Sequence, residues 1–124
     1  MVLGDDFDTV LDRVASAPKE EGFGILTEID IQATMESKLG IDYPRYRILG
    51  ACNPMLAHKA LSAIQEMELL LPCNVTVLEA GDGKVDISIV NPLRMMDIVD
   101  DPSFRQTAEE AQARLSRVAL FLKE

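Results

Sequence analysis

The chain has 124 residues, of which 48% are hydrophobic and 27% charged, and its formal net charge is −9. This length and balance exclude a disordered segment, so we expect residues 1–124 to form one folded domain. The acidic charge disfavours nucleic acid and anionic membranes as partners. No apolar run reaches the roughly 20 residues that cross a bilayer, and no signal peptide is visible. A cytoplasmic location is therefore expected.

The first half of the chain predicts helices that alternate with strands. Aspartate and asparagine cap helices, glycine stops them, and alternating apolar residues mark strands. Asn53 is followed by Pro54, which is tolerated at the first helical position, and a helix should therefore begin there. The expected elements are a helix capped by Asp5 or Asp6, a strand over residues 23–30, a helix between Asp30 and Gly40, a strand over residues 46–52, and a helix from Asn53 to Pro72.

The second half predicts a hairpin followed by two helices. Strands over residues 73–80 and 85–90 flank a glycine-rich turn at residues 81–84. A cap and a proline then recur at Asn91 and Asp101, which places helices near residues 92–99 and 102–123. The last helix carries an apolar stripe at steps of three and four: Phe104, Ala108, Ala111, Leu115, Val118 and Leu122.

These elements have the order αβαβαββαα and predict an α+β fold of two layers, with a mixed four-stranded sheet covered by helices. Alternation places Cys73 on the apolar face of its strand and Cys52 on the face of Tyr46, Ile48 and Gly50, taken as the apolar one. The opposite face would then carry an apolar patch that helices or a second copy must cover. Its members are Leu26, Leu49, Ala51, Leu78 and Val90.

Two segments carry a family resemblance. GACNP at residues 50–54, followed by LLPCNV at residues 70–75, resembles the domain of unknown function family numbered 302 over roughly residues 7–122. The resemblance implies a small two-layer α/β domain of an uncharacterised protein, dimeric in crystals. It implies no reaction and no catalytic residue, so the site must be inferred from the chemistry of the residues.

The two cysteines offer the clearest chemistry. Cys52 ends a strand just before a helix, where partial positive charge lowers a thiol pKa, although both Cys52 and Cys73 also suit a buried core. If their strands are neighbours, the pair can form a reversible disulfide or bind a soft metal. His58, the only histidine, can complete such a site or act as a general base, but its helical position favours a solvated surface.

The leading interpretation is a non-enzymatic, cytoplasmic module that binds a small ligand or a partner, acts as a homodimer and needs no cofactor. Its candidate site residues are Cys52, Asn53, Cys73 and Asn74. One alternative is a redox or soft-metal protein that uses Cys52 and Cys73. Another is a small hydrolase or transferase with Cys52 as nucleophile and His58 as base.

Overall fold

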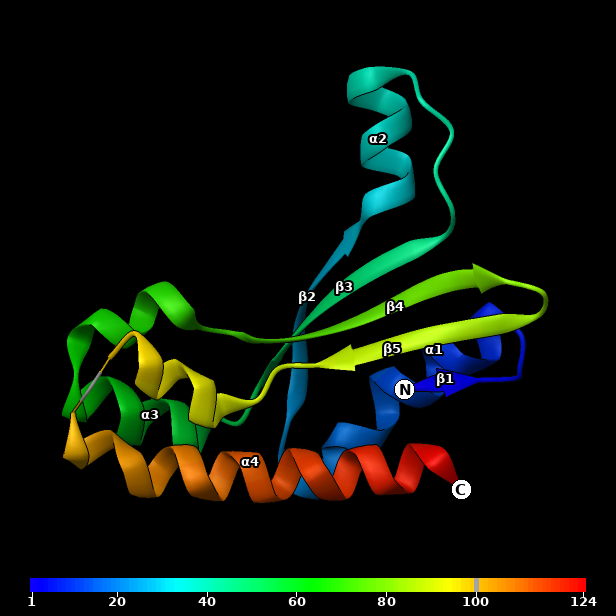
Figure 1. The fold of residues 1–124 in the computed structure, drawn as a ribbon. Helices are drawn as coiled ribbons and strands as arrows, with labels where there is room; N and C mark the ends of the chain where they lie inside the picture. Colours follow the sequence, from blue (N-terminus) through cyan, green and yellow to red (C-terminus); the bar gives the residue numbers. More distant parts are fainter. Residues whose placement is uncertain (100) are drawn as a thin grey trace.

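An antiparallel sheet organises the fold in the computed structural model, which describes residues 1–99 and 101–124 (Figure 1). Every strand pair is antiparallel, and the spatial order is β1-β5-β4-β3-β2. The strands are β1 (Val2–Leu3), β2 (Gly24–Asp30), β3 (Tyr46–Cys52), β4 (Cys73–Gly81) and β5 (Lys84–Ile89). No helix among the described residues is long and apolar enough to cross a membrane.

The α+β prediction is confirmed, with two differences in the sheet. There are five strands instead of four, because the two residues of β1 pair with β5 and are too few to show alternation in the sequence. The sheet is also wholly antiparallel instead of mixed. The helix between β2 and β3 stands beyond the ends of these strands, so the chain returns along its neighbour in the opposite direction (Figure 1).

The helices follow the predicted order, and their predicted caps are present. Asp6, Asn53 and Asp101 each accept a backbone N–H at the start of a helix. The predicted third helix is shorter than expected, because it ends at Ala63 and a 3-10 segment continues to Leu70. The elements are α1 (Phe7–Ser16), α2 (Ile31–Leu39), α3 (Pro54–Ala63) and α4 (Pro102–Lys123), with 3-10 segments η1 (Ala17–Glu21), η2 (Gln65–Leu70) and η3 (Pro92–Asp97).

Helices α1, α3 and α4 cover one face of the sheet, with α4 running lengthwise along it (Figure 1). All six residues of the predicted α4 stripe are buried, as their spacing requires. Residues of α1, β3, β4, β5 and α4 share one core cluster, and α3 joins α4 and the end of β3 in another. The two layers therefore form because each of these helices buries its apolar stripe against the same face of the sheet.

The prediction of which face of β3 is buried was wrong. Leu49 and Ala51 are 1% and 0% exposed and belong to the core, so Tyr46 and Ile48 point to the other face. A bulge in β2 between Ile25 and Thr27 also leaves Leu26 exposed. Both faces of β3 carry apolar side chains, so their alternation in the sequence does not indicate which face is buried. The buried face is set by packing against the helices.

The other face of the sheet is left without a helix over it (Figure 1). We call it the open face and define it by six side chains of β2, β3 and β4, which are half-buried or exposed: Thr27, Ile29, Tyr46, Ile48, Thr76 and Leu78. Helix α2 stands away from this face, and none of its nine described residues is buried. The predicted patch is therefore replaced by a different surface, because Leu49 and Ala51 lie in the core.

Gly50 allows β2, β3 and the chain before β4 to approach closely. A β-carbon on Gly50 would lie 2.1 Å from the Thr27 hydroxyl and 2.6 Å from Cγ of Pro72. The hydroxyl can rotate away, but the proline ring has little freedom to move. Pro72 is thus seated directly on β3, and this contact fixes where the chain before β4 lies.

We predict that Gly50→Ala destabilises the protein by about 1–3 kcal/mol, because the added methyl group overpacks this contact. The matched control is Gly24→Ala in β2, where a β-carbon meets nothing within 4 Å. Urea unfolding followed by circular dichroism measures both. Equal stabilities of the two variants would show that Pro72 does not constrain residue 50.

Candidate functional site

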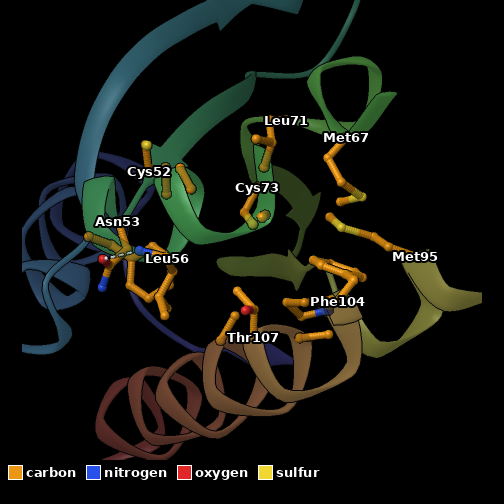
Figure 2. Close-up of a pocket in the computed structure, with 16 residues that line it drawn as sticks. Cys52, Asn53, Leu56, Met67, Leu71, Cys73, Met95, Phe104 and Thr107 are labelled. Carbon is orange, nitrogen blue, oxygen red and sulfur yellow. Dashed lines mark hydrogen bonds between the residues drawn. The ribbon is translucent and has the colours of Figure 1, made fainter. Parts of the chain in front are cut away.

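A small apolar pocket lies where the ends of β3 and β4 meet α3 and α4 (Figure 2). Its free volume is about 40 Å³, and η2 and η3 complete its wall. Leu56 of α3 and Phe104 of α4 are buried in its lining, whereas Leu71 and Thr107 in the lining are half-buried. The two sequence segments singled out above, 50–54 and 70–75, meet here.

The chemistry of the lining is almost entirely aliphatic, aromatic and sulfur. Its polar side chains are the amide of Asn53, the hydroxyl of Thr107 and the thiols of Cys52 and Cys73. Among the described lining residues there is no carboxylate, amine, guanidinium or imidazole. Such a lining favours a ligand that loses its hydration shell and leaves no net charge in the pocket.

Asn53 is a buried polar residue, 8% exposed, and its amide is occupied by the fold. Its Oδ1 accepts the N–H of Leu56 at 3.2 Å (Figure 2), and its Nδ2 donates to the carbonyl of Glu21 at 3.2 Å. The predicted cap is confirmed. Because both halves of the amide are bonded within the protein, Asn53 shapes the pocket wall instead of offering a free polar group.

The carbonyl of Glu21 also joins α4 to this corner. Arg114 donates to it at 3.0 Å, while Arg117 donates to the Glu21 carboxylate at 2.8 Å and thereby lowers the pKa of that carboxyl. Gly22, at a φ of 82°, leaves room for this arrangement, since a β-carbon there would lie 2.8 Å from Nδ2 of Asn53. Helices α3 and α4 and the start of β2 are thus tied together beside the pocket.

The two cysteines have opposite orientations. Cys73 pairs with Ala51, points to the covered face and is 8% exposed. Cys52 is the next residue after Ala51, so its side chain leaves β3 on the other side and is half-buried. The expectation that Cys52 belongs to the apolar face was therefore wrong, and both thiols are free.

Burial raises the pKa of the Cys73 thiol to about 11 from an ordinary value of 9.0, and the nearby thiol of Cys52 adds to the shift. Cys73 is thus protonated at neutral pH and is a poor nucleophile. The unfolded chain ionises first, so this thiol lowers stability as the pH rises from 9 to 11 and has no such effect below pH 9.

Two methionines that sequence reasoning did not treat as site residues lie beside Cys73. Met67 of η2 and Met95 of η3 are 0% and 7% exposed and share a buried cluster with Cys73. Their side chains point toward one another in Figure 2. We call Met67, Cys73 and Met95 the sulfur cluster. In the sequence, Met67 lies on the apolar stripe of the helix predicted from Asn53, but no pattern singles out Met95.

The remaining candidates lie elsewhere. Asn74 is exposed and does not line the pocket, although its carbonyl accepts the N–H of Val90 at 3.1 Å. His58 is exposed on α3, as predicted, and is also absent from the lining. Within residues 1–99 and 101–124, no three His, Cys, Asp or Glu side chains converge on a metal position.

Comparisons with known proteins agree with this fold. A family described as "Domain of unknown function DUF302" matches residues 1–120. A solved structure described as an uncharacterized conserved protein DUF302 from Bacillus stearothermophilus is 24% identical, with a TM-score of 0.85 over 95% of this chain and 91% of that one. At this identity the likeness shows the fold alone. No curated protein matches the chain.

We predict that Asn53→Ala lowers stability by about 1–2 kcal/mol, because α3 loses its cap and the Glu21 carbonyl loses a donor. The control is Asn91→Ala, which removes a similar cap before a proline at the exposed start of η3. Thermal unfolding of both variants measures the difference. An equal loss in both would mean that the bond from Asn53 to Glu21 adds nothing to the cap.

Proposed function

This chain belongs to the DUF302 family, whose function is unknown, and we propose that it is a non-enzymatic module that binds a small desolvated ligand in the pocket between β3, β4, α3 and α4. The observation that carries the proposal is the convergence of residues 50–54 and 70–75 on one apolar pocket. A hydrophobic core alone needs no free volume, because protein interiors pack closely.

The size of the pocket limits its ligand. A dry cavity of about 150 Å³ lined by apolar side chains holds benzene or xenon in another protein. The free volume of about 40 Å³ here favours a ligand of a few heavy atoms or a single ion. Half-buried Leu71 and Thr107 lie between the pocket and solvent and offer a route of entry.

The chemistry of the lining supports binding more than catalysis. A nucleophilic cysteine needs an adjacent base, but His58 is exposed outside the lining. The raised pKa of Cys73 also works against a thiolate nucleophile. A disulfide between Cys52 and Cys73 has less support, because Cys73 pairs with Ala51 and not with Cys52, and both thiols are free.

We predict that xenon, used as an uncharged probe, shifts the methyl NMR signals of Met67 and Met95 and leaves that of exposed Met55 unchanged. Ala57 of α3 lines the pocket and is half-buried, so Ala57→Leu should abolish the shifts by filling the free volume. Ala63→Leu, an exposed substitution on the same helix, should preserve them. Shifts absent from the wild type would rule out an accessible pocket.

The homodimer is the second part of the proposal, and the open face supports it. The six side chains that define this face carry no formal charge, although the chain as a whole carries −9. Asp86 of β5 lies on the same face opposite Leu78, and its carboxylate is 3.8 Å from the N-terminal ammonium group of Met1. A second copy can therefore approach here without strong repulsion between like charges. A symmetric pair would bury the same surface on both copies.

Helix α2 supports the same interface. It has nine residues, none buried, and helices this short are marginal in water without packing. Leu39 and Ile41 at its end are 66% and 44% exposed, and Ile29 on the adjoining open face is 48% exposed. A second copy that covers α2 and the open face would bury these apolar groups.

We predict that the wild type sediments as a dimer and that Ile29→Lys makes it a monomer, because a lysine would be buried unpaired in the interface. Leu120→Lys is the control, since Leu120 is 61% exposed on α4 and lies outside the open face. Analytical ultracentrifugation at several concentrations measures the mass. A monomeric wild type, or a dimer that survives Ile29→Lys, would contradict this interface.

A further inference from the structure

We propose that the pocket ligand is a soft monovalent metal ion of the Cu(I) class, bound by the thiolate of Cys73 and the thioethers of Met67 and Met95. This inference rests on the proposed small-ligand function and names the chemical class of the ligand. It differs from the metal site considered from the sequence, because Cys52 is replaced by two methionines that only the tertiary structure brings to Cys73.

The placement of the three sulfur atoms carries the inference. Met67 comes from η2, Cys73 from the start of β4 and Met95 from η3, yet all three are buried in one cluster. Figure 2 shows the ends of the two methionine side chains directed toward one another, with Cys73 on the sheet across the pocket from them. Each of the three residues also lines the pocket.

The donor set selects the kind of metal. Thiolate and thioether sulfur are soft ligands that favour Cu(I), whereas structural zinc sites use four cysteine or histidine ligands. The lining residues that the structure describes include no imidazole or carboxylate for a harder ion. Both cysteines and two of the six methionines line this one pocket, which makes sulfur its main coordinating element.

The charge of the ion also fits the pocket. A monovalent ion bound to one thiolate is neutral overall, so the apolar wall surrounds no net charge. A divalent ion on the same ligands would keep a positive charge that nothing in the lining balances. The apolar pocket therefore discriminates between ions by charge as well as by softness.

The binding step is a proton exchange. The Cys73 sulfur forms a bond to the metal, its S–H bond breaks, and the proton leaves to solvent, so the metal keeps its oxidation state and no reductant is needed once Cu(I) is supplied. The thiol holds its proton firmly because it is buried. Binding should release one proton per ion, and the affinity should rise about tenfold per pH unit below the pKa of the thiol.

Sulfur packing against an aromatic ring is the competing explanation. Phe104 belongs to the same cluster, and methionine makes favourable contacts with rings without any metal. That explanation predicts that leucine can replace either methionine with little effect on any property. The two explanations therefore differ in what Met→Leu substitutions do to metal affinity.

The test is anaerobic competition for Cu(I) between the whole protein and a chromophoric Cu(I) chelator. The wild type should take one ion per chain, and Met67→Leu and Met95→Leu should each weaken binding at least about tenfold, the equivalent of 1.4 kcal/mol. Both changes conserve volume and should keep the fold. Met96→Leu is the control, because Met96 adjoins Met95 but does not line the pocket.

Two results would overturn the inference. One is a wild type that takes up no Cu(I) while xenon still shifts the Met67 and Met95 methyl signals, which would leave the pocket intact but assign it another ligand. The other is unchanged affinity in both Met→Leu variants, which would place any bound ion elsewhere, such as at Cys52. If neither xenon nor Cu(I) binds, the proposed function fails together with the inference.

Discussion

The buried amide of Asn53 is the contact on which the arrangement of this protein most depends. One side of the amide caps α3, and the other bonds the Glu21 carbonyl, which also receives Arg114 from α4. Three parts of the chain that are distant in sequence are thereby held at one corner. A buried amide is stable only when its groups are paired, so the cap, the turn at Gly22 and the position of α4 require one another.

The pocket follows from this corner and from the contact of Pro72 on Gly50. The first places α3 and α4 beside the end of β3, and the second sets the path of the chain into β4. Between them remains a small volume with Cys73 on its wall. The same burial that keeps the Cys73 thiol protonated also removes water from the methionines around it. The packing of the pocket wall therefore also sets the protonation state of the Cys73 thiol.

The two faces of the sheet differ in how much of each is covered by helices. Helices α1, α3 and α4 cover one face and form three core clusters with its strands and the 3-10 segments. The other face keeps uncharged side chains in partial contact with solvent beside a helix that buries none of its own residues. The pocket and the open face are thus separate features, one inside the two layers and one outside them.

The local features of this protein are predictable from neighbouring residues in the chain. Asp6, Asn53 and Asp101 capped their helices, the glycines of residues 81–84 turned the hairpin, and the α4 stripe faced the core, because each depends on neighbouring residues or on helical spacing. Tertiary packing alone selects which face of β3 is buried, since both of its faces are apolar. It alone also brought Met67 and Met95 to Cys73, because contacts between separate elements leave no period in the sequence.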